Sequence, residues 1–89
     1  MEINKRASAG TMESSDAYVE IEPAEAGLQI ELESVVQAQF GDEILAVVRE
    51  VLNECGVENA HVTVQDRGAL DCVIRARVET AVNRGKEEV

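Results

Sequence analysis

The run Ala17-Tyr18-Val19-Glu20-Ile21-Glu22 decides the fold, because its side chains alternate between small or aliphatic and larger polar groups. A period of two is typical of a strand with one buried face, and Ala17, Val19 and Ile21 form that face here. Pro23 follows directly and predicts the end of the strand, because proline cannot donate to a ladder of backbone hydrogen bonds. The sequence therefore predicts a strand over residues 17–22 whose apolar face needs a covering layer.

The preceding segment, Gly10-Thr11-Met12-Glu13-Ser14-Ser15-Asp16, consists mostly of small and polar residues. Serine, aspartate and glycine favour tight exposed turns, because they hydrogen-bond the local backbone or tolerate unusual dihedral angles. Residues 6–13 predict a first strand, so that the two strands form a hairpin with Ser14 at its tip. A hydroxyl in that position is accessible to a modifying enzyme, but most serines in acidic turns only shape the turn. The spacing alone leaves both interpretations open.

Two further segments alternate in the same way and predict strands, namely Leu28-Gln29-Ile30-Glu31-Leu32-Glu33 and Ala60-His61-Val62-Thr63-Val64-Gln65. The outward positions of these strands gather four acidic side chains: Glu20, Glu22, Glu31 and Glu33. Paired carboxylates do acid–base chemistry where an apolar site shifts their pKa values, but open alternating strands favour a solvated face. We also expect His61 to be a solvated surface residue. A general base is the alternative, although no acid or nucleophile stands beside it in the sequence.

A helix is predicted over residues 42–55, where apolar side chains recur at helical spacing: Ile44, Val47, Val48, Val51, Leu52 and Cys55. Such a stripe can cover the apolar face of the sheet. Asp42 and Glu43 favour the positive N-terminal end of the helix, and Gly56 favours its termination. Residues 35–40 fit either a continued strand or a loop.

The segment after the turn signal Asp66-Arg67-Gly68 fits two patterns. Residues 69–78 alternate, which favours a strand that forms a hairpin with residues 60–65. A helical stripe runs through the same residues, but Arg77 would interrupt it. We therefore expect a strand over residues 69–78, followed by a short helix that ends at Arg84.

Together these elements predict one α+β domain over residues 1–89. Its mainly antiparallel sheet of short strands would carry one long helix on its apolar face and a short C-terminal helix. Residues 1–5 and 85–89 are expected to be loose. Tyr18 and Phe40 are the only aromatic residues, so the core must be built from valine, isoleucine, leucine and alanine.

The composition excludes several classes of partner. Eighteen acidic and eight basic residues give a formal net charge of −10. Nucleic acids and anionic membrane surfaces both require lysine and arginine, so neither is expected as a partner. No apolar run reaches the length of a membrane span and no signal-peptide segment is present, which predicts a cytoplasmic protein. Cys55 and Cys72 lack a CxxC spacing, and we expect free thiols that act as small core residues.

The sequence contains no catalytic constellation. It has no metal-ligand cluster, no glycine-rich phosphate loop, and no nucleophile paired with a base. We therefore expect neither catalytic nor metal-binding residues. Any chemistry would come from a cofactor and from partner proteins, while this chain supplies placement.

Several segments nevertheless form a specific set of motifs: Met1-Glu2-Ile3-Asn4, Ala9-Gly10-Thr11-Met12-Glu13-Ser14, Phe40-Gly41-Asp42, Asp66-Arg67-Gly68-Ala69-Leu70-Asp71-Cys72 and Arg75-Ala76-Arg77. Over nearly the whole chain they resemble the acyl carrier (gamma) subunit of citrate lyase. In that family the serine after Gly-Thr-(Leu/Met)-Glu carries phosphoribosyl-dephospho-coenzyme A through a phosphodiester. The resemblance implies that Ser14 is the attachment site, with the adjacent Ser15 as the alternative.

The resemblance also implies a non-catalytic subunit of a lyase complex. Its arm would present acetyl and citryl thioesters to the alpha (acyl transferase) and beta (lyase) subunits while citrate is cleaved to acetate and oxaloacetate. A prosthetic-group transferase would load the serine. Two alternatives stay open: a carrier for a related thioester enzyme such as malonate decarboxylase, and an unmodified scaffold or regulatory subunit.

Overall fold

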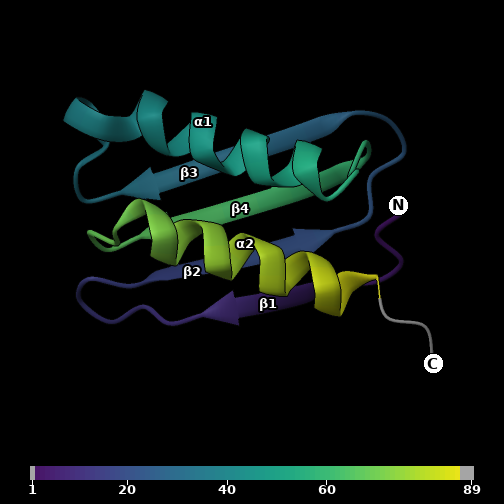
Figure 1. The fold of residues 1–89 in the computed structure, drawn as a ribbon, viewed down its shortest axis with the longest axis horizontal. Helices are drawn as coiled ribbons and strands as arrows, with labels where there is room; N and C mark the ends of the chain where they lie inside the picture. The colour runs from purple at the N-terminus through teal and green to yellow at the C-terminus, as the bar shows by residue number, and fades with distance from the viewer. Residues whose placement is uncertain (1, 87–89) are drawn as a thin grey trace.

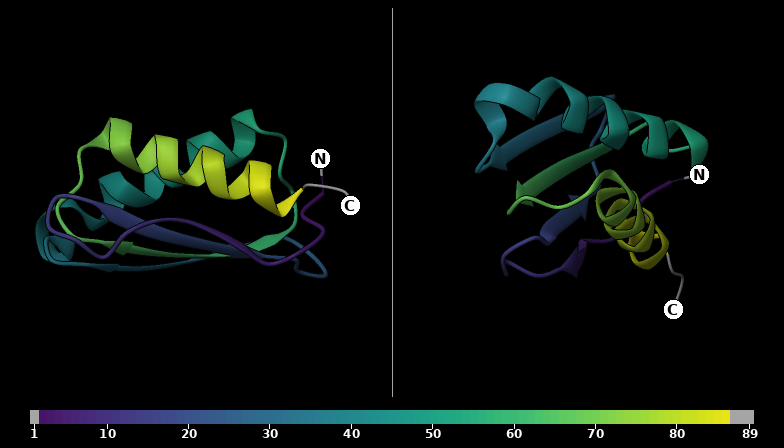
Figure 2. Two further views of the ribbon diagram at one scale, coloured as in Figure 1. Left: turned by 90° about the horizontal axis from the view of Figure 1, so that it is seen from below. Right: turned by 60° about the vertical axis from the view of Figure 1, so that its left-hand side comes forward.

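A computed structural model describes residues 2–86, with the backbone alone for residues 37 and 38. Its elements in chain order are β1 (Ala7–Gly10), β2 (Ala17–Glu22), β3 (Leu28–Ser34), α1 (Gln37–Glu54), β4 (Ala60–Asp66) and α2 (Asp71–Gly85). The strands form one sheet in the order β1-β2-β4-β3 (Figure 1). Both helices lie across the same face of this sheet and leave the other face uncovered (Figure 2). The expected α+β architecture is confirmed.

The sheet is mixed, because one of its three pairings is parallel. β2 pairs antiparallel with both β1 and β4, whereas β3 runs parallel to β4, with Leu28 opposite Ala60. Parallel neighbours need a crossover connection, and α1 supplies it because it lies between β3 and β4 in the chain. The alternation of a strand predicts the face of each residue, but it does not predict the direction of the neighbouring strand.

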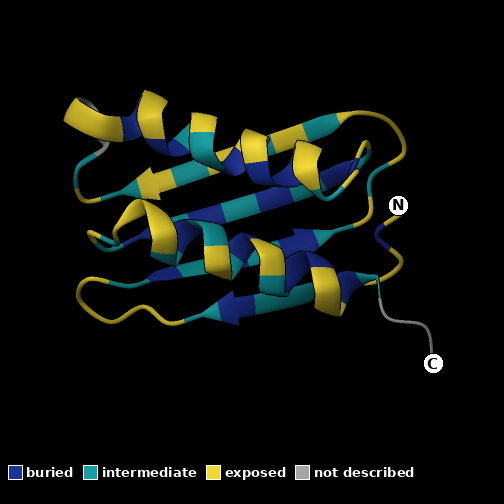
Figure 3. Cartoon of the chain, in the orientation of Figure 1, coloured by how far each residue is buried: buried dark blue, intermediate teal, exposed yellow. Residues whose placement is uncertain are grey.

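The core lies between the sheet and the two helices and is built from aliphatic side chains (Figure 3). The inward residues of β2 that the alternation predicts, Ala17, Val19 and Ile21, are at most 1% exposed. The four acidic residues expected on a solvated face, Glu20, Glu22, Glu31 and Glu33, are half-buried or exposed. The period-two pattern therefore predicts the two faces of the sheet correctly.

The long helix α1 begins at Gln37, earlier than the apolar stripe predicts. The hydroxyl of Ser34 accepts the N–H of Val36 at 3.1 Å, which turns the chain out of β3 directly into the helix. Asp42 and Glu43 consequently lie beyond the first helical turn, which contains no acidic residue. The prediction that they lie at the positive N-terminal end of the helix is therefore wrong.

The other end of α1 and its buried face agree with the sequence pattern. The predicted stripe is buried or half-buried throughout: Ile44, Val47, Val48, Val51, Leu52 and Cys55. Gly56 has a φ of 73°, and its N–H donates to the carbonyl of Asn53 at 3.0 Å. Glycine tolerates this left-handed conformation, so it ends the helix at the predicted position.

Residues 69–78 do not form a strand, because most of them belong to α2. β4 already has a partner on each side, so it offers no free edge for a further hairpin. The segment instead follows the helical pattern, and the apolar side chains of that stripe are fully buried: Ile74, Val78, Ala81 and Val82. Arg77 does not interrupt that face, since its side chain is directed to its flank and contacts the turn between β1 and β2.

Both thiols are free, as expected, but they differ in burial. Cys55 is half-buried against the core, whereas Cys72 is exposed in the first turn of α2. The expected core role of Cys72 is therefore wrong. A strand would have placed it on one side of the sheet together with Leu70, while a helix directs residues two positions apart to different sides.

The N-terminal segment lies against the end of α2. Ile3 is 5% exposed, and the N–H groups of Asn4 and Lys5 both donate to the carbonyl of Gly85, at 2.8 and 3.1 Å. Gly85 is itself buried between Ile3 and Ile21. Neither helix in the described part of the chain is both long and apolar enough to span a bilayer.

Candidate functional site

The serine turn, residues 11–16, connects β1 to β2 at one end of the sheet (Figure 1). β1 ends at Gly10, earlier than the expected strand over residues 6–13, because the chain reverses there with a φ of 101°. A Cβ atom on Gly10 would lie 1.8 Å from the carbonyl oxygen of Ala17. The N–H of Thr11 donates to the same oxygen at 3.2 Å, which closes the hairpin. Only glycine fits this position.

Asp16 anchors the serine turn to α2. Its carboxylate accepts hydrogen bonds from Nε and Nη2 of Arg77 at 3.0 and 2.9 Å, and from Oγ1 of Thr11 at 2.7 Å. The N–H of Ala17 adds a further bond at 2.7 Å. The bonds from Arg77, and next those from Thr11 and Ala17, lower the pKa of Asp16 to about 2. The carboxylate therefore stays ionised and holds both ends of the turn.

This anchor predicts a pH-dependent contribution of Asp16 to stability. The pKa of Asp16 is about 2 in the folded chain and 3.8 ordinarily, so its stabilising effect is present above pH 3.8. That effect is lost as the pH falls from 3.8 through 2. We expect urea unfolding to show native protein more stable than Asp16→Asn near neutral pH, with the difference shrinking over that acid interval. A difference that stays constant down to pH 2 would contradict the role of the carboxylate charge.

A second anchor links the serine turn to the segment after β4. The N–H of Ser15 donates to the carbonyl of Arg67 at 2.8 Å, and the N–H of Arg67 donates to the carbonyl of Asp16 at 2.9 Å. Ser15 has a φ of 67°, which is unusual for a residue with a side chain. The backbone of Ser15 is thereby committed to holding the turn in place.

Ser14 lies at the exposed tip, where the sequence predicts it. Within residues 2–86 the hydroxyl of Ser14 forms no hydrogen bond with another side chain or backbone group, and neither does that of Ser15. An unshielded hydroxyl on an anchored turn can receive a bulky group without loss of any internal bond. Both hydroxyls are accessible, and the difference between them lies in the strained, hydrogen-bonded backbone of Ser15.

Sequence reasoning missed the two residues that anchor the turn, Arg67 and Arg77. Both belong to the quoted motifs, but Arg77 contacts Asp16 across 61 positions of the chain. No local pattern indicates so distant a partner. The one available signal was an arginine beside an otherwise apolar helical stripe, which a nearby carboxylate explains.

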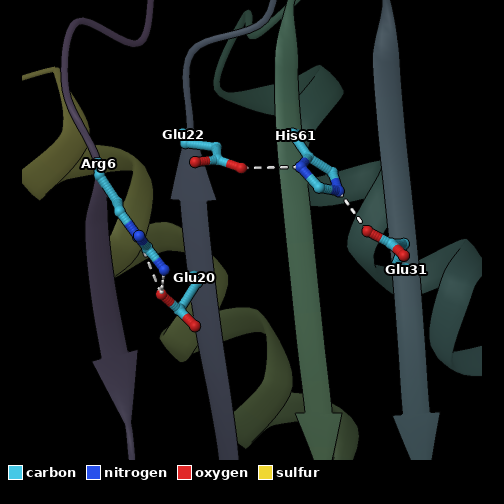
Figure 4. A network of polar contacts seen from close by, with 5 residues as sticks. All are labelled: Arg6, Glu20, Glu22, Glu31 and His61. Carbon is cyan, nitrogen blue, oxygen red and sulfur yellow. Dashed lines mark hydrogen bonds and ion pairs between the residues drawn. The ribbon is translucent and has the colours of Figure 1, made fainter.

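A second polar cluster lies on the uncovered face of the sheet (Figure 4). Nδ1 of His61 is 2.9 Å from Oε1 of Glu22 on β2, and Nε2 of His61 contacts Oε2 of Glu31 on β3. The hydrogen bonds to Glu31 and, second, to Glu22 raise the pKa of His61. Both ring nitrogens donate only when the imidazole is protonated. His61 therefore lies on the uncovered face, as expected, but it is not freely solvated. With Glu22 and Glu31 it forms a clasp across three strands that favours the protonated imidazole.

The clasp does not have the geometry of a catalytic or metal site. Arg6 and Glu20 form a neighbouring ion pair at 2.7 Å, and the ring of His61 itself occupies the space between Glu22 and Glu31, with both of its nitrogens engaged. Nowhere in the described part of the chain do three or more histidine, cysteine, aspartate or glutamate side chains gather as metal ligands. The serine turn is therefore the candidate functional site.

The clasp predicts a second pH effect. Because the folded-state pKa of His61 is raised above its ordinary value of 6.5, its stabilising effect is fully present below pH 6.5. It is lost as the pH rises through the raised value. Native protein should therefore unfold at a higher urea concentration than His61→Gln at mildly acidic pH, and the two midpoints should converge in alkali. Midpoints separated equally on both sides of the histidine titration would show that the charge is irrelevant.

Comparison with known proteins identifies the family. The family model of the acyl carrier proteins described as malonate decarboxylase delta subunit (MdcD) matches residues 4–85. The citrate lyase acyl carrier protein of Escherichia fergusonii is 56% identical over 89 residues, covering 99% of this chain and 92% of that protein. That of Halothermothrix orenii is 46% identical over 92 residues, covering 100% of this chain and 98% of that protein. The chain therefore belongs to the acyl carrier protein family, and within it to the group of the citrate lyase carriers.

Family membership has two direct consequences. Acyl carrier proteins are non-catalytic carriers that hold a prosthetic group covalently, so the expectation of a non-catalytic subunit is confirmed. The fold also recurs in a solved structure, a Pseudomonas malonate decarboxylase hetero-tetramer in complex with malonate. One chain of that structure has a TM-score of 0.81, with 94% of this chain and 87% of that chain covered. At 22% identity, the likeness is one of fold.

Proposed function

We propose that this chain, over residues 1–89, is the acyl carrier domain of a cytoplasmic citrate lyase, and that Ser14 carries phosphoribosyl-dephospho-coenzyme A through a phosphodiester. The observation that carries the proposal is the exposed, unpaired hydroxyl of Ser14 on a turn held from two sides. It is supported by the names of relatives that are about half identical over the full chain. Ser15 is the less favoured site, because its backbone is strained and hydrogen-bonded to Arg67.

The residues present fit such a group. A phosphodiester needs an oxygen that a transferase can approach, and the side chain of Ser14 is exposed. The attachment point must also keep its place when a large group is added, and Asp16 supplies this through Arg77. The backbone of Arg67 holds the other side of the turn through its bonds to Ser15 and Asp16.

When bound, the group would supply a thiol for thioesters of acetate and citrate, which ease carbon–carbon cleavage because a thioester stabilises negative charge on the adjacent carbon. This chain would contribute only the positioning of the acyl group at the active sites of its partners. A flexible attachment keeps the acyl group at high effective concentration near several active sites. We propose that those sites belong to an alpha (acyl transferase) and a beta (lyase) subunit. The acidic uncovered face of the sheet would suit basic entrances on such partners.

A carrier for malonate decarboxylase is the second candidate. The matching family model carries that description, and the malonate decarboxylase hetero-tetramer shares the fold. We favour citrate because the relatives at 46–56% identity are citrate lyase carriers, whereas the decarboxylase chain is 22% identical.

Reconstitution with both sets of partners tests the proposed substrate. The loaded chain is mixed with the alpha and beta subunits of a citrate lyase, or with the remaining subunits of a malonate decarboxylase. We expect citrate-dependent release of oxaloacetate in the first mixture and little carbon dioxide from malonate in the second. Activity only in the malonate mixture would show that the chain is a malonate decarboxylase carrier. Inactivity in both mixtures would favour a scaffold subunit that carries no acyl group.

A further inference from the structure

An apolar groove lies between the N-terminal parts of α1 and α2. Its volume is about 630 Å³, and its walls include Phe40 and Ile44 from α1, Ala69 and Leu70 from the loop before α2, and Cys72 from the first turn of α2. Phe40 is 45% exposed and Leu70 is 71% exposed. A pocket of this size is in the range that binds small organic ligands, and exposed apolar side chains around one hollow indicate an absent occupant.

The groove opens at the same end of the molecule as the serine turn. Both helices begin at that end, and the turn between β1 and β2 lies there too (Figures 1 and 2). The connection is direct, because Ser15 donates to the carbonyl of Arg67 at 2.8 Å and Gly68, the next residue, lines the groove. A group attached to Ser14 therefore starts a few residues away from the groove.

We propose that this groove is the resting seat of the thiol-bearing end of the arm on Ser14, an inference that rests on the proposed function. The distal part of a coenzyme A-derived arm is a neutral chain of amides that ends in a thiol, and an apolar wall suits it. The lining of the groove includes two exposed acidic residues, Glu43 and Asp71, and a third, Asp66, that is buried and bonded to Ser34 and Ala69. The exposed carboxylates of Glu43 and Asp71 would repel the phosphates of the arm and favour its uncharged end, so they would select which part of the arm occupies the groove.

The position of Cys72 makes the proposal testable without any activity assay. Its thiol is exposed and lies in the wall of the groove. If the arm rests there, its terminal thiol lies close to Cys72. Mild oxidation with diamide then removes one hydrogen from each thiol, joins the two sulfur atoms in a disulfide, and reduces the diamide. Cys55 serves as the matched control, because it caps the opposite end of α1.

The experiment uses loaded protein whose Ser14 adduct has been verified by mass, with partners absent. We expect diamide to give an internal disulfide between the arm and Cys72, which fragment masses will locate. The Cys72→Ser variant should form no such disulfide. Leu70→Asp should slow the link several-fold, since it places a charge on the groove wall at a side chain too exposed to matter for folding.

A second readout is the alkylation of Cys72 by iodoacetamide. In loaded protein whose arm thiol has been capped with a methyl group, alkylation of Cys72 should be several-fold slower than in unloaded protein, while Cys55 reacts equally in both.

The outcomes separate the two proposals. If Ser14 carries the adduct but Cys72 is neither linked to the arm nor protected from iodoacetamide, the groove is not the resting seat of the arm, while the carrier function stands. That result is expected if the groove instead receives a partner. A link formed equally with Cys55 also overturns the seat. A chain with no adduct overturns the proposed function and the seat together.

Discussion

Replacing Ser14 by alanine should abolish loading of the chain with the proposed coenzyme A-derived group, whereas replacing Ser15 by alanine should leave loading largely intact. This is the largest effect that we expect, because the Ser14→Ala variant lacks the oxygen that would form the proposed phosphodiester. Ser15 carries an equivalent hydroxyl on the same exposed turn, but its backbone is held by Arg67 with a φ of 67°. The pair of variants separates the chemistry of one hydroxyl from the general exposure of the turn.

The measurement is transfer of a labelled prosthetic-group precursor by the loading enzymes, followed by citrate cleavage with added partner subunits. Ser14→Ala should give background values in both assays. Neither serine hydroxyl bonds to another described residue, so both variants should unfold at nearly the native urea concentration. Loading that survives in Ser14→Ala and disappears in Ser15→Ala would move the site by one residue.

Gly10→Ala, at the end of β1 where the serine turn begins, should strongly destabilise the fold. The new Cβ would lie 1.8 Å from the carbonyl oxygen of Ala17, and the φ of 101° is unfavourable for any residue with a side chain. Strained backbone and overpacking each cost about 1–3 kcal/mol, so we expect a total loss of roughly 2–6 kcal/mol. The hairpin must open to relieve the contact, which also releases the turn that holds Ser14.

Gly27→Ala is the matched control for this effect. Gly27 also has a positive φ, of 79°, but no atom lies within 4 Å of the position of its Cβ. Its cost should be only the conformational one, about 1 kcal/mol. Urea unfolding of the two variants gives the comparison. Equal losses would mean that the contact with Ala17 does not constrain the turn.

Local patterns were sufficient to predict the parts of the fold that depend on one segment at a time. The alternation of residues 17–22 predicts β2 with its bounds and its buried face, and Gly56 predicts the end of α1. The serine turn is predictable for the same reason, since small and polar residues between two strands favour an exposed turn.

Features that depend on distant partners could not be predicted in this way. The sequence pattern predicts only the last part of α2 as a helix, because Arg77 interrupts the apolar stripe over residues 69–78. Only the folded chain reveals Asp16 as the partner of that arginine. The parallel pairing of β3 with β4 likewise depends on the crossover of α1 rather than on the composition of either strand. The groove could not be predicted, because its walls come from the starts of α1 and α2, and the sequence pattern places both starts too late in the chain.

The most direct test of the central claim is the mass of the native chain, purified from cells that cleave citrate, with fragments mapped across residues 7–22. We predict that Ser14, and not Ser15, carries an adduct. Its mass should equal that of phosphoribosyl-dephospho-coenzyme A minus one water. An unmodified chain within an active lyase complex would contradict the account, and so would an adduct that consists of a phosphate alone.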